Sequence, residues 1–387
     1  MIRYMSAGES HGKSVCVIVE GFPAGLKVSG EYINVQLARR QQGYGRGNRM
    51  KIEKDKVDIS SGVRYGETIG SPVCLKVVNR DWENRKKEMS VYEKDRSPEF
   101  VKTRPRPGHA DLAGVLKYNR FDISDILERA SARETAARVA AGAVARKFLS
   151  ELNIDILSYT KQIGEVRAAG FSFNCKEIME RIESSPLRCP DEEAESKMME
   201  EIKKASSEGD TLGGDFCVAA CGVPPGFGSH IQWDRKLDGR IAGAMMSVQG
   251  IKGVEIGGGF ELASLRGSRV HDEIAYDKEK KSFYRHSNRA GGVEGGMSNG
   301  ENIVVNAAMK PISSLKKPLK SVDIKTKRKK DSQVIRSDVC AVPAASIVGE
   351  AVMAMELAGL VLEKTGGDSM VEVKRNYSAY IQQLSDF

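Results

Sequence analysis

The 387-residue sequence has little of what several common classes of protein depend on. Its seven cysteines are scattered and form no CxxC pair, so no zinc-binding set of cysteine and histidine is recognisable. No stretch approaches the roughly 18 apolar residues of a membrane-spanning helix. The N-terminal segment also lacks the apolar core of a signal peptide. We therefore expect a cytoplasmic protein with reduced cysteines, no metal site and no membrane partner.

The sequence also lacks the motifs of common nucleotide-binding and hydrolytic sites. Neither GxSxG nor GxxxxGK[ST] occurs, and the glycine clusters do not match the GxGxxG fingerprint of dinucleotide-binding folds. There are only five histidines. His11, in GESHG, and His109, in RPGHAD, lie beside glycine in polar turns, where an imidazole can reach a ligand and exchange protons near neutral pH. Structural or surface roles are favoured for His230, His271 and His286.

What the sequence has is positive charge, with a formal net charge of +8 and a pI near 9.0. Four arginines, Arg39, Arg40, Arg46 and Arg49, fall within the glycine-rich stretch RRQQGYGRGNR. Arginine offers paired donors that match phosphate and carboxylate oxygens, and glycine lets a ligand approach the backbone. This pattern favours a site for a small molecule with several negative charges over a solvated basic loop.

Two other charged segments leave alternatives open. The run KTKRKK at 325–330 is similar to a nucleic-acid-binding patch, but no aromatic residues interleave with its charges, so a solvated loop is favoured. The triplet Arg336-Ser337-Asp338 precedes an expected helix. It is either a salt bridge at the start of that helix or a pair that holds an anion and offers a base.

Expected helices and strands are interleaved, but no regular series of crossover helices joins the strands. This favours an α+β fold with antiparallel pairing. The clearest helix is expected over 128–152, where eight alanines make it small-sided nearly all round and suit it to the centre of the fold. Its first turns carry Arg129, Ser131, Arg133 and Glu134 at the positive end of the helix dipole, a natural anion site.

Further helices are expected over 31–42, with Ser29 as the N-cap, and over 344–364 and 369–384. The composition between about 171 and 208 is charged and helical, which suggests a peripheral insert.

Taken together, the motifs resemble the chorismate synthase family. They follow one another in the family's order along nearly the whole chain: AGESHG at 7–12, RRQQGYGRGNRM at 39–50, RPRPGHAD at 104–111, RASARET at 129–135, GDTLGG at 209–214, WDRKLD at 233–238, KGVEIGGGF at 252–260, GGVEGGMSNG at 291–300, KPISSL at 310–315 and RSD at 336–338. Ten ordered matches make a chance resemblance implausible.

The resemblance implies a lyase, EC 4.2.3.5, that ends the shikimate pathway of aromatic amino acid biosynthesis. Such enzymes form chorismate from 5-enolpyruvylshikimate 3-phosphate by a 1,4-anti elimination of phosphate, and they require reduced FMN. Both molecules are phosphorylated and the substrate also carries two carboxylates, which agrees with an arginine-rich cavity. NADPH is implied as a source of flavin reduction, with a separate flavin reductase as an alternative.

The fold implied by the resemblance is a single α+β domain over 1–387, a β-α-β sandwich with a helical layer between two antiparallel four-stranded sheets. The basic segment at about 316–333 is expected to be a mobile loop. The family is typically a homotetramer, a dimer of dimers.

The resemblance also implies roles for individual residues. His11 would protonate the departing phosphate, His109 would lie near the reduced flavin, and Asp338 would help to remove the C6 proton. Substrate would be bound by Arg40, Arg46, Arg49, Arg106, Ser131, Arg133 and Arg336. Flavin would be bound by Arg129, Ala130, Ser131, Gln249, Gly250, Gly295, Lys310, Pro311, Ile312, Ser313, Ser314 and Arg336. A nicotinamide cofactor role attaches in the family to the positions of Arg40 and Arg46.

The chain departs from the family pattern at two of these places. Gln249-Gly250 stands where the family often has Asn-Ala or Gln-Ala, and Val339-Cys340 follows Asp338 where many members have proline. Two functions of other classes stay as alternatives: a basic nucleic-acid-binding protein, and a flavin- and NADPH-dependent oxidoreductase with net hydride transfer.

Overall fold

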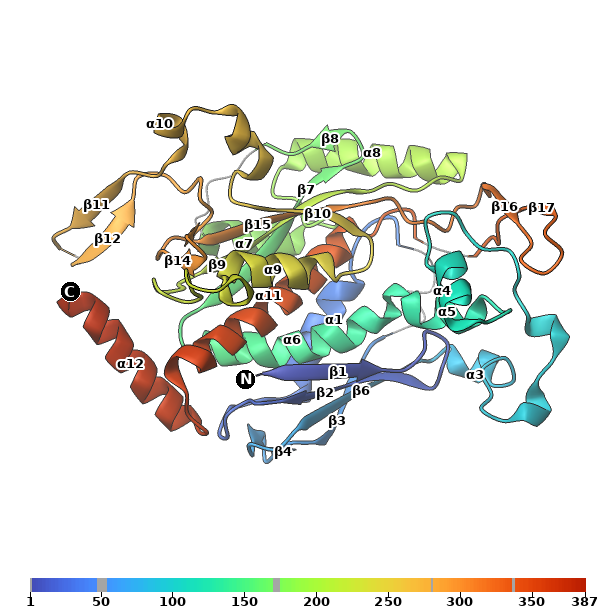
Figure 1. Ribbon diagram of the computed structural model, residues 1–387, viewed down its shortest axis with the longest axis horizontal. Coiled ribbons are helices and arrows are strands. Elements are labelled where there is room, and N and C mark those ends of the chain that lie inside the picture. The colour runs from blue at the N-terminus through green and yellow to red at the C-terminus, as the bar shows by residue number, and fades with distance from the viewer. Residues whose placement is uncertain (1, 47–53, 170–174, 280, 336–337) are drawn as a thin grey trace.

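The computed structural model describes residues 2–46, 54–169, 175–279, 281–335 and 338–387, and it is a mixed helix and strand structure (Figure 1). The longer helices are α1 (Gly30–Gln41), α4 (Asp111–Tyr118), α5 (Ser124–Ala130), α6 (Thr135–Ser150), α7 (Cys175–Ser184), α8 (Glu192–Glu208), α9 (Leu237–Met246), α11 (Val342–Thr365) and α12 (Met370–Asp386). Short helices are α3 (Trp82–Arg85) and α10 (Gly267–Val270).

The first sheet is fully antiparallel, with the order β1 (Arg3–Ala7), β2 (Ser14–Glu20), β6 (Val73–Val78) and β3 (Val57–Ser61). Buried and more exposed side chains alternate along its strands, as expected for a sheet with one buried face. Val15, Val17 and Val19 of β2 are buried, whereas Ile18 between them is exposed. One face of this sheet therefore contributes to the core.

The second sheet is also antiparallel and has five strands, in the order β10 (Ile251–Ile256), β15 (Ile303–Met309), β9 (Gly214–Cys221), β7 (Asp155–Ile163) and β8 (Val166–Arg167). The prediction gave each of the two sheets four strands, so it is wrong for this sheet, which has five. The chain turns back after Ile163 and adds the two-residue strand β8 at one edge. Two-stranded hairpins complete the β structure: β4 (Val63–Arg64) with β5 (Glu67–Thr68), β11 (Ile274–Asp277) with β12 (Ser282–Arg285), β13 (Val293–Glu294) with β14 (Met297–Ser298), and β16 (Lys320–Val322) with β17 (Lys329–Asp331).

Two long helices join the sheets. Helix α6 packs on β2 and β6 of the first sheet, α11 packs on β7 and β9 of the second, and the two helices pack on each other (Figure 1). A Cβ atom added to Gly142 of α6 would lie 2.4 Å from the Cβ of Ala351 in α11, so only glycine permits this close approach. The small residues that suggested a central helix therefore serve helix–helix packing.

The helix predicted over 128–152 is in fact two helices. Helix α5 ends at Ala130, Ser131 has extended backbone with φ −65° and ψ 142°, and α6 begins at Thr135 after a short 3₁₀ turn. The Ser131 hydroxyl accepts a hydrogen bond from the Arg133 backbone N–H at 3.3 Å, which starts the new turn as a capping residue does. The break falls within RASARET, so it redirects the side chains of this motif.

Helix α11 corrects a second expectation. By length and composition it is apolar enough to cross a membrane, but in the structure it is mostly buried inside the fold. It is the kind of helix that is apolar all round because protein surrounds it.

The cysteines agree with the expectation in part. Cys16, Cys74, Cys189, Cys217 and Cys340 are free thiols. Cys221 is disulfide-bonded, so the expectation of reduced cysteines is wrong for that residue.

Candidate active site

Two buried arginines of the predicted substrate site share one carboxylate. Arg40, on α1, donates to Asp55 Oδ2 at 2.7 Å, and Arg133, in the turn before α6, donates to Asp55 Oδ1 at 2.6 Å. Burial by itself raises the pKa of Asp55, but the two guanidinium groups outweigh this effect and hold the pKa below its usual value. Asp55 therefore stays ionised and fixes both arginines.

The arginines outnumber the carboxylate that they share, which leaves positive charge at this place. Burial, together with the charges of Arg133 and Arg46, lowers the pKa of Arg40 to about 10, with Asp55 opposing the change. Arg40 is still charged at neutral pH. Among the described residues its buried Nε has no hydrogen-bond partner, so this donor is available to bind an anion.

Arg46 and Asp338, far apart in the sequence, form an ion pair in which Arg46 Nε lies 2.8 Å from Asp338 Oδ2. The backbone holds the two segments together, because the Val339 N–H donates to the Gly45 carbonyl at 3.0 Å. Arg46 also reaches the Arg40 carbonyl at 3.5 Å. Arg40, Arg46 and Asp338 are thus brought into one region, while Arg49 and Arg336 lie outside the described residues.

His11 is held by a carboxylate that sequence analysis did not single out. Its Nδ1 lies 2.8 Å from Glu128 Oε1, and its backbone N–H donates to Glu128 Oε2 at 2.7 Å. The turn itself is fixed by Asn79, which donates to the carbonyls of Glu9 and Gly12 and accepts from Arg133 Nε at 2.6 Å. This chain of bonds links His11 to the Arg133–Asp55–Arg40 cluster.

The turn that carries His11 also meets Ser131. The Ser131 hydroxyl donates to the Ser10 hydroxyl at 3.1 Å, and the Ser10 N–H donates to the Glu128 carbonyl. The break between α5 and α6 therefore allows residues of RASARET to face AGESHG.

His109 repeats the arrangement of His11. Its Nδ1 lies 2.6 Å from Oδ1 of Asp111, a residue with no exposed surface. The same carboxylate accepts two hydrogen bonds from the Arg106 side chain, at 2.9 Å from Nε and 3.1 Å from NH2. Burial works to raise the pKa of Asp111, but hydrogen bonds from His109 and Arg106 hold it well below its usual value. One carboxylate thus positions a predicted catalytic histidine and a predicted substrate arginine.

Replacing Asp111 by asparagine is expected to lower kcat by about 10- to 100-fold, the usual effect of removing the partner of a functional histidine. The amide cannot accept bonds from His109 and Arg106 with the same charge. The measurement is steady-state turnover of the substrate, with Asp125→Asn on the surface of α5 as the control. In a His109→Ala background, Asp111→Asn should lower kcat much less. An equally large fall of kcat in that background would refute the idea that Asp111 acts by positioning His109.

The segment Lys310–Ser314 lies against the Arg106–Asp111 turn. Arg106 NH1 donates to the Ser314 hydroxyl at 2.6 Å, and Lys310 Nζ donates to the Gly108 carbonyl. A Cβ on Gly108, whose φ is +76°, would lie 3.7 Å from the Ser313 Cβ. The predicted flavin segment and the His109 turn are therefore neighbours.

A connected group of predicted flavin residues surrounds Glu134. Gln249 Nε2 donates to Glu134 Oε2 at 3.0 Å, and Arg129 NH2 lies 3.8 Å from Glu134 Oε1. Gly250, at φ +87°, accepts a backbone hydrogen bond from Lys310 at 2.9 Å. These contacts bring Arg129, Gln249, Gly250 and Lys310 into one chain of neighbours.

Gly295 is separate from this group of predicted flavin residues. It is in the turn between β13 and β14 at φ +59°, and the nearest side-chain atom to its would-be Cβ is that of His230 at 4.0 Å. The described contacts of Gly295 do not join it to the other predicted site residues.

Arg39 does not join the arginine site although it belongs to the same motif. It pairs with Glu350 at 2.7 Å and with Glu183 at 2.6 Å. Adjacent residues of a helix point about 100° apart, so Arg39 and Arg40 leave α1 in different directions. Arg146 and Arg188 complete a buried cluster around Glu350.

This cluster predicts a pH dependence of stability. Burial raises the pKa of Glu350, but Arg39, Arg146 and Arg188 outweigh it and lower the pKa to about 2, from 4.5. Because the folded-state pKa is depressed, the stabilisation is complete above pH 4.5 and is lost as the pH falls toward 2, by roughly 3 kcal/mol in all. Urea unfolding against pH should show this loss in the parent and in an exposed control, Glu208→Gln. Its persistence in Glu350→Gln would contradict the assignment.

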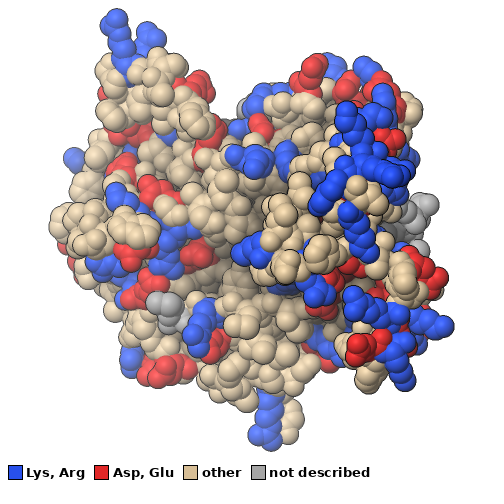
Figure 2. Space-filling view, turned by 45° about the vertical axis from the view of Figure 1, so that its right-hand side comes forward, with Lys and Arg blue, Asp and Glu red and all other residues tan. Residues whose placement is uncertain are grey.

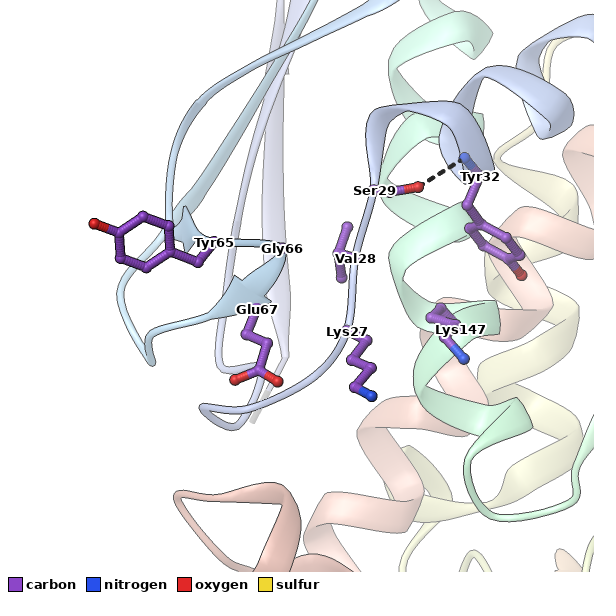
Figure 3. Close-up of a pocket in the computed structure, with 8 residues that line it drawn as sticks. All are labelled: Lys27, Val28, Ser29, Tyr32, Tyr65, Gly66, Glu67 and Lys147. Carbon is purple, nitrogen blue, oxygen red and sulfur yellow. Dashed lines mark hydrogen bonds between the residues drawn. The ribbon is translucent and has the colours of Figure 1, made fainter.

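Two cavities lie apart from these arginines. One, of about 270 Å³, lies between the β4–β5 hairpin and helices α1 and α6 (Figure 3). The other, of about 310 Å³, adjoins Glu128 and is lined by five carboxylates, so it does not suit a polyanion. The described lining of neither cavity includes a predicted substrate arginine.

Comparison with known proteins identifies the family. The chorismate synthase family model matches residues 2–362. The chorismate synthase of Desulforudis audaxviator is 56% identical over 384 residues, covering 99% of this chain and 98% of that protein. This chain belongs to the chorismate synthase family. The chorismate synthase of Geobacter sulfurreducens is 55% identical over 393 residues, covering all of both chains.

A crystal structure of chorismate synthase matches the fold with a TM-score of 0.80 at 45% identity, covering 100% of this chain and 99% of that one. The family resemblance is thereby confirmed, as is the enzyme class, since chorismate synthases are carbon–oxygen lyases.

The residues present suit the flavin that the chorismate synthase family implies. Gln249 Oε1 is buried and has no hydrogen-bond partner in the part of the chain that the structure describes, so it can accept a hydrogen bond from a ligand N–H. Lys310 and Arg129 are cations in the same chain of neighbours, as a flavin phosphate requires. Arg129, Gln249, Lys310 and Ser313 are the residues that would hold the cofactor.

Four acidic or amide residues that hold arginines and histidines of this candidate site were not singled out from the sequence: Asp55, Asn79, Asp111 and Glu128. Glu134 stood inside RASARET, at the expected anion-binding helix start. Asp111 and Glu128 stood inside or beside quoted motifs, so their nearness to functional residues was a usable signal. Asp55 and Asn79 carried none, because their partners are separated from them by 15 to 78 residues.

Proposed function

We propose that this protein is a chorismate synthase that eliminates phosphate from 5-enolpyruvylshikimate 3-phosphate, with reduced FMN as the required cofactor. The observation that carries the proposal is the convergence of Arg40 and Arg46, from one motif, with Arg133, from a distant one. Such a group of fixed guanidinium donors suits a substrate that carries one phosphate and two carboxylates.

His11 is assigned as the acid that protonates the leaving phosphate. Its Nδ1 faces Glu128, so Nε2 is the atom that can hold and deliver a proton to the departing oxygen. The ring is oriented from two sides, since Glu128 binds both its Nδ1 and its backbone N–H. Protonation at this point reduces the charge on the phosphate as its bond to carbon breaks.

Asp338 is assigned as the group that accepts the proton from C6. Its carboxylate is oriented by Arg46, whose Nε lies 2.8 Å from Asp338 Oδ2. Reduced FMN, when bound, lends electron density transiently and recovers it. His109, fixed by Asp111, would contact the flavin, while Arg106 would bind a substrate anion.

Several finer features belong to the same proposal. They are a single domain over the whole chain with a helical layer between two sheets, flavin contacts by Ala130, Ser131, Gly295 and Pro311 through Ser314, substrate contacts by Arg49 and Arg336, and a cytoplasmic homotetramer. Arg40 and Arg46 are also proposed as contacts of NADPH, which would serve flavin reduction. The connected sheets and helices of one core support the single domain.

The test measures both the formation of product and the absorbance spectrum of the flavin. Purified protein with anaerobic reduced FMN and substrate should form chorismate, followed by its absorbance, and substrate should perturb the flavin spectrum. No turnover and no spectral change would refute the proposal. One NADPH consumed for each product formed would instead favour an oxidoreductase.

A further inference from the structure

We propose that the basic hairpin, residues 316–331, collects polyanionic small molecules and speeds their entry into the arginine site. The inference rests on the proposed function, because the arginine site is the destination. The molecules concerned carry two or more phosphate or carboxylate groups.

The basic hairpin holds most of the protein's excess charge. Its cations are Lys316, Lys317, Lys320, Lys325, Lys327, Arg328, Lys329 and Lys330, and all eight are exposed. Two carboxylates, Asp323 and Asp331, leave a net charge of +6, against +8 for the whole chain. Figure 2, which brings the right-hand side of Figure 1 forward, shows Lys and Arg gathered on the side where β16 and β17 lie.

The basic hairpin is bound to the loop that leads into the active site. The Ser321 hydroxyl donates to the Pro105 carbonyl at 2.5 Å, and the Ile324 N–H donates to the Thr103 carbonyl at 2.9 Å. Thr103 Oγ1 donates to Asp323 Oδ2 at 2.6 Å. Two residues after the hairpin ends, the Gln333 N–H donates to the Arg104 carbonyl. Residues 103–105 therefore tie the hairpin to Arg106.

The basic hairpin also begins where the predicted flavin segment ends. Ser314, the partner of Arg106, is two residues before Lys316, and the N–H groups of Lys316 and Lys317 both donate to the Gly209 carbonyl at 3.1 Å. The cations are thus connected to the site from both sides, by residues 103–106 and by residues 310–317.

Electrostatic theory predicts that these exposed charges change the association rate of a ligand more than its affinity. Exposed cations are screened by salt, with a Debye length of about 10 Å at 0.1 M, so they add little to the affinity of a ligand that is bound beyond them. A concentrated field at a site entrance raises association rates by about 10- to 1,000-fold at low ionic strength. A substrate with one phosphate and two carboxylates is suited to such attraction.

The test compares two variants that each lose four positive charges. The hairpin variant carries Lys325→Gln, Arg328→Gln, Lys329→Gln and Lys330→Gln. The control variant removes four exposed cations from α10 and the β11–β12 hairpin, which lie at the opposite side of Figure 1: Arg266→Gln, Arg269→Gln, Lys278→Gln and Lys281→Gln. Stopped-flow flavin absorbance measures the association rate of substrate with the FMN-loaded protein.

The association rate of the hairpin variant is expected to fall about 3- to 30-fold at about 20 mM salt and to match the parent at about 1 M salt. The dissociation rate and kcat should not change. An equal fall in the control variant, or no fall in the hairpin variant, would overturn the proposal.

Two other outcomes separate a failure of the proposed function from a failure of this inference alone. If the parent shows no flavin response to substrate at any salt concentration, the proposed function fails and the inference fails with it. If the parent binds a DNA duplex at micromolar concentration with a steep salt slope that the hairpin variant loses, while substrate association is unchanged, the hairpin is a nucleic-acid site and the inference is wrong.

Discussion

Replacing His11 by alanine is expected to slow chorismate formation by about 10²- to 10⁴-fold, the range lost with a positioned general acid. The physical reason is that the leaving phosphate would depart without a proton from a ring that Glu128 holds in place at 2.8 Å. The loss should appear in kcat more than in KM, because the proton is delivered in the transition state. Single-turnover absorbance with anaerobic reduced FMN separates the chemical step from product release.

A matched control is available for this experiment. His271 is exposed and has no predicted role, so His271→Ala should retain parental kcat. His109→Ala is expected to lose a similar amount to His11→Ala. Parental activity in both His11→Ala and His109→Ala would remove the catalytic assignment of these residues.

Replacing Asp55 by alanine is expected to lower the free energy of unfolding by about 3–5 kcal/mol, the usual result of removing one partner from a buried ion cluster. The change leaves Arg40 and Arg133 facing each other without their shared carboxylate. Both arginines are buried, so water compensates poorly for the lost carboxylate. Urea unfolding followed by circular dichroism measures the loss.

The neighbouring strand offers the control for Asp55. Asp58, on β3, is exposed, and Asp58→Ala should change the free energy of unfolding by no more than about 0.5 kcal/mol. A small effect of Asp55→Ala would mean that the arginines do not depend on this carboxylate. Added substrate should stabilise Asp55→Ala more than the parent, because an anion can stand between the two guanidinium groups.

Local signals in the sequence predicted the helices whose ends are set by near neighbours. Ser29 caps α1 by accepting from the Tyr32 N–H, as its type and position indicated. Ser369 and Glu372 form a capping box at the start of α12, where a helix was expected to begin. Both caps act over three residues, so adjacent residues contain all the information.

The prediction of one helix over 128–152 failed because a local pattern was overruled. Alanine-rich periodicity continues across Ser131, yet the hydroxyl of Ser131 bonds to the Arg133 N–H and to Ser10 of a distant turn. The break in the helix allows Ser131 to contact Ser10 in the turn that carries His11. Helical propensity is a small term per residue, and such contacts exceed it.

The sequence by itself determined the family and the mixed helix and strand character, and it predicted a ligand with several negative charges, because ordered motifs and clustered arginines can be read along the chain. Only the tertiary structure decided that Arg40 faces Asp55 while Arg39 faces Glu350, and that Asp111 and Glu128 hold the two histidines. The reason is that a buried charge is stable only beside its partner, and which partner it meets depends on how sheets and helices pack.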